Sequence, residues 1–169
     1  MRERIGNLEK RNVDGEKIGL GNYAALLFWQ ARRQPQREAL VIDDESLTYE
    51  MFWQRVVSMA LAASSLGVHG DVLVEADDFL EQAIAFLALQ AVGVRPILLH
   101  HGMRPEELQE ILQANHLQGI WRCRSGGVQL FDASGLPEQP HEETDILGVL
   151  SSGSTGTPKV MYRTYESWA

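Results

Sequence analysis

The stretch Gly148-Val-Leu-Ser-Ser-Gly-Ser-Thr-Gly-Thr-Pro-Lys-Val-Met161 governs how the rest of the sequence is interpreted. An apolar run over residues 145–150 leads directly into a segment of Ser, Thr and Gly, which one Pro and one Lys close. Glycines let backbone N–H groups turn toward an anion, hydroxyls add donors, and Lys159 adds positive charge. A polar surface loop is the alternative, since such clusters are common in loops. The density of donors beside a lysine favours an anion-binding loop.

The composition predicts one globular domain that does not bind nucleic acid. The chain has 169 residues, of which 44% are hydrophobic, and a formal net charge of −8. That charge leaves no basic patch for nucleic-acid phosphates. A single cysteine excludes an intrachain disulfide and fits the cytoplasm, and no apolar run reaches the roughly 18 residues of a membrane span.

The order of expected elements predicts an α/β fold in which a layered, mixed or parallel β-sheet is flanked by helices. Residues 1–21 are expected to form a mobile or loosely docked lead-in. Helices are expected behind Asn22, over 49–66, over 79–92 and from Pro105. Strands are expected at 38–42, 47–48, 71–76, 95–100, 119–123, 128–131, 145–150 and 159–163, with an exposed connector over 132–143.

The helix over 79–92 is apolar on nearly every side, so we expect it to lie between two layers. Asp78, three residues before Glu81, resembles the start of a capping box. The pair Asp77-Asp78 could also be read as catalytic carboxylates, but its place at a helix start favours capping. Thr164 is expected to cap a final helix of about one turn. So short a helix buries no face, and the sequence is therefore expected to end within a domain.

Other candidate reactive residues give weaker signals. Cys123 lies between Arg122 and Arg124, which could lower the pKa of its thiol, but no motif surrounds it and we expect a structural role. The five histidines show no metal-ligand spacing beyond the adjacent pair His100 and His101, whose side chains would point to opposite faces of a strand. We therefore expect no metal site.

Three familiar motifs do not fit the Ser/Thr/Gly segment. A Walker A loop, G-x-x-x-x-G-K-[ST], opens a helix, whereas Lys159 is followed by Val160 and a strand-like run. The dinucleotide fingerprint G-x-G-x-x-G requires a different spacing of glycines. The nucleophile elbow G-x-S-x-G fails because Ser152 stands where a glycine is needed.

Residues 151–159, Ser-Ser-Gly-Ser-Thr-Gly-Thr-Pro-Lys, resemble the phosphate-binding signature of the adenylate-forming superfamily. This superfamily includes acyl-CoA synthetases, aryl acid ligases, luciferases and nonribosomal adenylation domains. Upstream, Leu47-Thr-Tyr-Glu50 before a long helix resembles the segment L-T-Y-x-E-L. The stretches Phe86–Gly93, Pro96–His101 and Pro105–Leu108 resemble the segment L-x-A-G-x-x-x-x-P-L-x-P. The resemblance covers the sequence from about residue 20 onward.

Enzymes of this superfamily join a carboxylic acid to ATP, release pyrophosphate and leave an acyl-adenylate. The acyl group then passes to coenzyme A or to a phosphopantetheinyl carrier-protein thiol. The resemblance implies that the loop wraps the β- and γ-phosphates, where its donors would act on the charge of the departing pyrophosphate. The residues to which it assigns phosphate binding are Ser151, Ser152, Gly153, Ser154, Thr155, Gly156, Thr157 and Lys159.

The sequence departs from the superfamily pattern in two ways. Val160 replaces the usual Gly after the Lys, and because a β-branched residue adopts positive φ only at a cost, the exit of the loop is expected to be stiffer. The motifs for adenine, ribose and Mg²⁺ and the catalytic Lys of the superfamily lie beyond residue 169. The resemblance therefore assigns no catalytic residue and no metal ligand here. It implies that residues 22–169 are the incomplete front part of the large N-terminal domain, truncated after the phosphate loop.

The leading hypothesis is an N-terminal fragment or split subunit of an ATP-dependent carboxylic acid ligase, inactive alone and partnered by the remainder of the ligase in cis or in trans. A second hypothesis is a non-catalytic interaction module that keeps the front half of the adenylation fold. Its exposed sheet edge and apolar surface would favour self-association. A third is an independent nucleotide- or anion-binding domain. Acid specificity and the choice of acyl acceptor are not encoded in this stretch.

Overall fold

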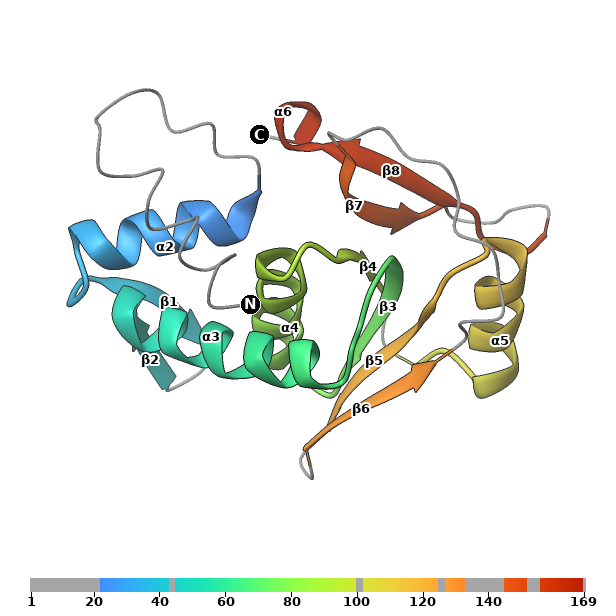
Figure 1. The fold of residues 1–169 in the computed structure, drawn as a ribbon, viewed down its shortest axis with the longest axis horizontal. Helices are drawn as coiled ribbons and strands as arrows, with labels where there is room; N and C mark the ends of the chain where they lie inside the picture. The colour runs from blue at the N-terminus through green and yellow to red at the C-terminus, as the bar shows by residue number, and fades with distance from the viewer. Residues whose placement is uncertain are drawn as a thin grey trace.

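The structure, a computed structural model, describes residues 22–42, 45–99, 102–124, 127–132, 145–151 and 156–168. The expected lead-in over residues 1–21 and most of the expected connector lie outside this part of the chain, as do His100 and His101. Within it, strands and helices alternate as the sequence predicts, and they build a mixed α/β fold (Figure 1).

The larger sheet has six strands in the order β6-β5-β3-β4-β7-β8. Its four central strands, β3 (Asp71–Ala76), β4 (Arg95–Leu98), β5 (Gly119–Arg124) and β7 (Asp145–Leu150), are mutually parallel. The strands β6 (Gly127–Asp132) and β8 (Val160–Thr164) pair antiparallel at the two edges. The observed β4 is shorter than the expected strand over 95–100. The sheet is therefore mixed, one of the two arrangements that the sequence allowed.

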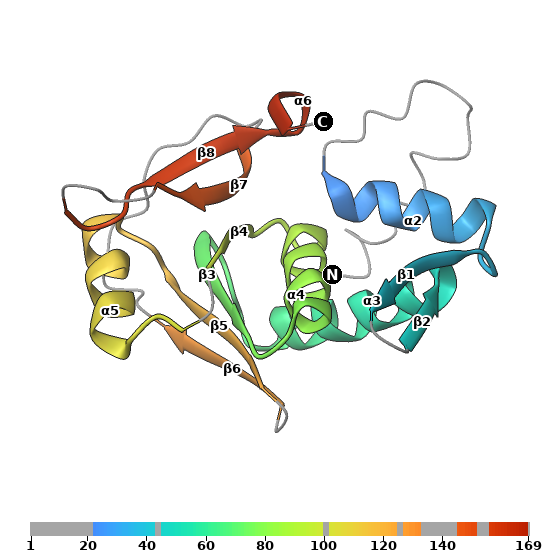
Figure 2. The same ribbon diagram turned by 180° about the vertical axis from the view of Figure 1, so that it is seen from behind.

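Helices cover both faces of this sheet (Figures 1 and 2). Alternate residues of β3 point to opposite faces, so Val72 and Val74 pack with α4 (Phe79–Ala91) and Leu73 packs with α5 (Pro105–Ala114). Because both faces are covered, the central strands read as nearly continuous apolar runs.

The helix α4 is buried on two sides, as its all-round apolar sequence predicts. One side contacts the sheet through Ala85 and Leu89. The other side belongs to a second core with α2 (Tyr23–Arg33), α3 (Tyr49–Ser65) and the hairpin of β1 (Glu38–Ile42) and β2 (Glu45–Thr48). The expectation of a helix between two layers is confirmed.

N-cap hydrogen bonds confirm the predicted helix starts. Oδ1 of Asn22 accepts from Ala25 N at 2.9 Å and Oδ1 of Asp78 accepts from Glu81 N at 2.8 Å, while Thr48 caps α3. Thr164 Oγ1 likewise accepts from Ser167 N at 3.1 Å and starts the four-residue α6 (Tyr165–Trp168). Asp78 therefore acts as a helix cap, as its position predicts.

Gly70 sets the turn into β3. Its φ of +66° lies in the left-handed region, and a Cβ there would lie 2.3 Å from Oε1 of Gln118. Both the backbone conformation and the contact thus require glycine. The close approach allows Gln118 to reach the first residue of β3, which matters for the site described next.

Candidate phosphate-binding site

The Ser/Thr/Gly segment joins β7 to β8 as the end of an antiparallel hairpin. β7 pairs in parallel with β4 through Ile97–Gly148 and Leu98–Val149, which ties the hairpin to the sheet. In both views the start of β8 lies beside α5 (Figures 1 and 2). The strand after the loop confirms that it is not a Walker A loop, which would lead into a helix.

The base of the loop is closed by two hydrogen bonds between Ser151 and Lys159. Ser151 N donates to Lys159 O at 2.8 Å, and the Ser151 hydroxyl oxygen accepts from Lys159 N at 2.9 Å. The hydroxyl keeps its own proton for donation. Ser151, expected to contact phosphate, thus also holds the two ends of the loop together.

Asn115, the C-cap of α5, contacts the exit of the loop. Its Nδ2 donates to Pro158 O at 2.9 Å and to Ile111 O at 3.0 Å, while its Oδ1 accepts from Val160 N at 2.8 Å. Sequence reasoning missed this residue. The only local signal is an Asn at a helix end, which normally indicates a cap and not a contact with a segment 43 positions away.

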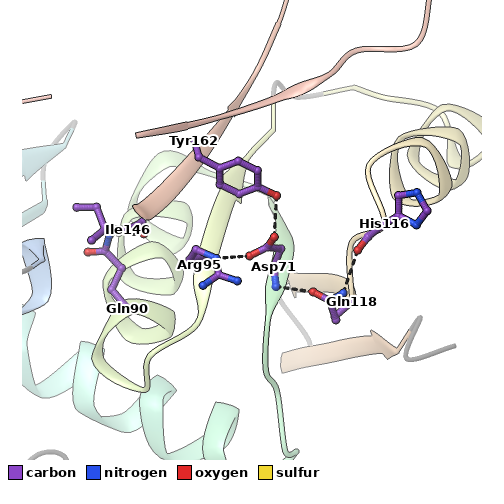
Figure 3. Close-up of polar contacts among 7 residues, drawn as sticks. All are labelled: Asp71, Gln90, Arg95, His116, Gln118, Ile146 and Tyr162. Atoms are coloured by element: carbon purple, nitrogen blue, oxygen red, sulfur yellow. Dashed lines mark hydrogen bonds and ion pairs between the residues drawn. The ribbon is translucent and has the colours of Figure 1, made fainter. Parts of the chain in front are cut away.

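A buried polar network fixes β8 against the sheet (Figure 3). The carboxylate of Asp71, only 1% exposed, accepts from the Tyr162 hydroxyl at 2.6 Å and from Arg95 Nε at 2.5 Å. The backbone of Asp71 is bonded in turn to Gln118, whose Oε1 accepts from Asp71 N at 2.8 Å and whose Nε2 donates to His116 O at 2.9 Å. A buried carboxylate needs such partners to offset its desolvation.

Gln90 fixes the start of β7. Its side chain is 3% exposed, its Nε2 donates to Ile146 O at 3.1 Å and its Oε1 accepts from Tyr23 N at 3.1 Å. One buried amide thus joins the first turn of α2 to the strand that leads into the loop. Both arms of the hairpin are therefore held by side chains from other elements.

Val160 has a different role from the one expected. It is the first residue of β8. Among the described residues, His116 is the only one other than glycine with a positive φ, so the backbone of Val160 does not carry the predicted cost of a positive φ. Its side chain packs on the α5 core. Cγ1 of Val160 would lie 2.6 Å from a Cβ on Gly148, so the valine occupies space that Gly148 leaves open.

The predicted phosphate-binding residues fall into two groups. Gly156, Thr157 and Lys159 are exposed, and Ser151, which pairs with Lys159 at the base of the loop, is half-buried. Ser152, Gly153, Ser154 and Thr155 lie outside the described residues. At the described loop positions, 151 and 156–159, the side chains offer an ammonium group and hydroxyls but no carboxylate, a donor set that suits a polyphosphate and not a cation.

The surroundings of the other candidate reactive groups are typical of residues with a structural role. Burial raises the pKa of the Cys123 thiol to about 12, and Arg122 and Arg124, which could have lowered it, are both paired with Glu75. Burial and the raised pKa thus support the expectation of a structural cysteine over a reactive one. Across the described part of the chain, no group of three or more His, Cys, Asp or Glu residues could hold a metal. No described helix is both long enough and apolar enough to cross a bilayer.

Solved structures with a similar fold are adenylate-forming enzymes. The O-succinylbenzoate coenzyme A synthetase MenE from Bacillus subtilis, in complex with AMP, matches 82% of this chain with a TM-score of 0.66 at 21% identity. The N-terminal subdomain of Klebsiella oxytoca NpsA matches 84% with a TM-score of 0.65 at 19% identity. The match covers 42% and 40% of those chains, so the likeness shows a shared fold over part of each.

Relatives by sequence are ligases and adenylation enzymes. A 4-chlorobenzoate–CoA ligase from an Arthrobacter species is 29% identical over 164 residues, covering 79% of this chain and 31% of the ligase. The pyochelin synthase PchD from Pseudomonas aeruginosa is 28% identical, covering 87% of this chain and 34% of that protein. The chain thus spans about a third of the length of these curated relatives. The model of the AMP-binding enzyme family matches residues 27–121, more than half of the sequence, and the chain belongs to that family.

Proposed function

We propose that this chain carries the triphosphate-binding loop of an ATP-dependent carboxylic acid ligase. In the complete enzyme the acid would react with ATP to form an acyl-adenylate and pyrophosphate, and the acyl group would pass to coenzyme A or to a carrier-protein thiol. Family membership and the ligases among its relatives support this reaction class. Because the family match ends at residue 121, the role of the loop itself rests on its sequence and geometry.

One observation carries the proposal: the side chain of Lys159 is exposed beside the base of a donor-rich loop, and Ser151 and Lys159 close that base with two hydrogen bonds. The ammonium group of a lysine at this place is a point charge that can reach a phosphate, and Ser151 and Thr157 offer hydroxyl donors beside it. The residues proposed to contact the β- and γ-phosphates remain 151–157 and Lys159. When Mg²⁺ is bound with ATP, it would neutralise part of the triphosphate charge, and its protein ligands would lie outside this chain.

The partner that we propose is the remainder of the ligase, in cis or in trans, and the location is the cytoplasm. A chain a third as long as its relatives would supply the phosphate side of the site without the adenine and ribose contacts. We therefore expect no acid-dependent ATP–pyrophosphate exchange by this chain alone. Clear exchange with any of several aryl or fatty acids would contradict this part of the proposal.

The decisive experiment is calorimetric titration of the chain with tripolyphosphate, ATP and AMP. If the loop binds phosphates alone, tripolyphosphate and ATP should bind with similar, weak affinity and AMP should bind more weakly still. Lys159→Ala should reduce the affinity for both polyphosphates several-fold, since a charge-assisted contact is lost. Arg32→Ala, which removes one exposed charge from α2, is the matched control and should leave binding unchanged. Equal binding by the Lys159→Ala variant would overturn the assignment.

A further inference from the structure

The backbone on both sides of Lys159 is held by hydrogen bonds to Ser151 and Asn115. Four consecutive polar groups run from Pro158 O to Val160 N, and each is paired. Ser151 pairs with the two groups of Lys159 itself. Asn115 pairs with the two groups on either side of it, so the residue is clamped from two directions while its side chain is exposed.

Asn115 is suited to this position by its chemistry. An amide side chain presents one acceptor and one donor side by side, and here the acceptor receives Val160 N while the donor reaches Pro158 O. A carboxylate would place negative charge against the Pro158 carbonyl, and an aliphatic side chain would leave both backbone groups without this partner. The interaction is thus specific to a primary amide at this distance.

The helix that carries Asn115 is packed into the core. α5 is anchored in the core by the buried side chains of Leu108, Ile111 and Leu112. His116, with a φ of +53°, ends the helix in the left-handed conformation, and Leu117 N donates back to Leu112 O at 3.0 Å. A side chain at a helix end held in this way keeps its place relative to the core, and its hydrogen bonds hold the loop exit at that place.

We propose that Asn115 is a positioning residue that fixes the backbone of Lys159 so that its ammonium group is presented to a bound polyphosphate. The proposal deepens the function proposed above and rests on it for the identity of the ligand. The competing possibility is that Asn115 only stabilises the hairpin. In that case its loss would lower thermal stability without changing the affinity of the folded protein.

The matched control is Tyr162→Phe. Tyr162 is another anchor of β8, but its hydroxyl contacts Asp71 and not residues 158–160. Its loss should lower thermal stability without altering the affinity of the folded chain for tripolyphosphate. Asn115→Ala should weaken tripolyphosphate binding by no more than the several-fold loss expected of Lys159→Ala, because Asn115 acts only through that lysine.

The test is a double-mutant cycle with sodium tripolyphosphate, measured calorimetrically at a temperature where every variant is folded. If Asn115 acts through Lys159, the double variant Asn115→Ala/Lys159→Ala should bind no more weakly than Lys159→Ala alone. Full additivity, or unchanged binding by Asn115→Ala, would overturn the proposal.

Backbone ¹⁵N relaxation without ligand gives a second, independent readout. The Lys159 amide should become more mobile in Asn115→Ala and remain ordered in Tyr162→Phe. If the Lys159 amide is equally ordered in Asn115→Ala, Asn115 does not position it, whatever the loop binds. If it becomes mobile while the wild-type chain fails to bind tripolyphosphate, the positioning role stands and the proposed ligand is wrong.

Discussion

Gly148 and Val160 fit together across the hairpin: a Cβ on residue 148 would lie 2.6 Å from Cγ1 of Val160 and 2.7 Å from Cγ1 of Ile97. The side chains of Val160 and Ile97 therefore occupy the space that a methyl group on residue 148 would need. Where the superfamily pattern has a glycine after the lysine, this chain has the valine that fills this space.

Gly148→Ala should destabilise the chain by about 1–3 kcal/mol, because the added methyl forces two β-branched side chains to move. Chemical denaturation with a two-state fit measures the change in the free energy of unfolding. The double variant Gly148→Ala/Val160→Ala should recover part of the loss, since one of the two close contacts is removed. Equal destabilisation with and without Val160→Ala would show that this contact does not limit residue 148.

Tyr162→Phe should cost about 2 kcal/mol of stability, the usual value for a hydrogen bond to a charged group. The variant keeps the ring and removes the hydroxyl that donates to the buried carboxylate of Asp71. Comparison of denaturation midpoints at constant slope measures it. A loss below about 0.5 kcal/mol, the level of an ordinary surface substitution, would mean that the bond is of little consequence.

Asp78→Ala should destabilise α4 by about 1 kcal/mol, because the N-cap acceptor for Glu81 N is lost. Asp77→Ala is the matched control, since Asp77 is an adjacent exposed carboxylate outside the cap and should change stability little. Thermal unfolding of the two variants separates the cases. Similar losses in both would argue against a specific capping role for Asp78.

Cys123 should react with a thiol reagent at pH 8 only after denaturation, because burial raises its pKa to about 12 and keeps the thiol neutral. The raised pKa also predicts a pH dependence of stability. Between the ordinary value of 9.0 and about 12, the unfolded chain releases the Cys123 proton and the folded chain retains it. The contribution of this thiol is therefore complete below pH 9 and is lost as the pH rises.

The pH dependence can be measured by comparing wild type with Cys123→Ala from pH 7 to 11. The difference in unfolding free energy between the two chains should be constant below pH 9 and shrink above it. Tyrosines and lysines titrate in both chains, so their contributions cancel in this difference. A constant difference over the whole range would rule out the predicted shift.

The elements of the fold were predictable where the signal was local. The caps Asn22, Asp78 and Thr164 lie within three residues of the amides that they bond, and the apolar surface of α4 is visible in one window of sequence. The strand order β6-β5-β3-β4-β7-β8 was not predictable, since it depends on pairings between segments that no local pattern specifies.

The candidate site was predictable in composition but not in its support. The Ser/Thr/Gly segment and its lysine are read directly from residues 151–159, whereas Asn115 reaches the loop exit, and Asp71 anchors β8, only through contacts 43 and 91 positions apart. The reasoning about Val160 failed because it assumed a left-handed backbone at the loop exit. That position is the start of a strand, where a β-branched side chain is favoured.

The Asp71–Tyr162 bond also sets an order of events during synthesis. Asp71 opens the first strand of the large sheet, and its partner Arg95 follows 24 positions later, but Tyr162 follows only after 91 positions. At roughly 5–20 residues per second, a ribosome needs several seconds or more to deliver that tyrosine. The bond that seals the last edge strand onto the sheet thus forms late, and a nascent chain must hold an unfinished sheet edge until β8 emerges.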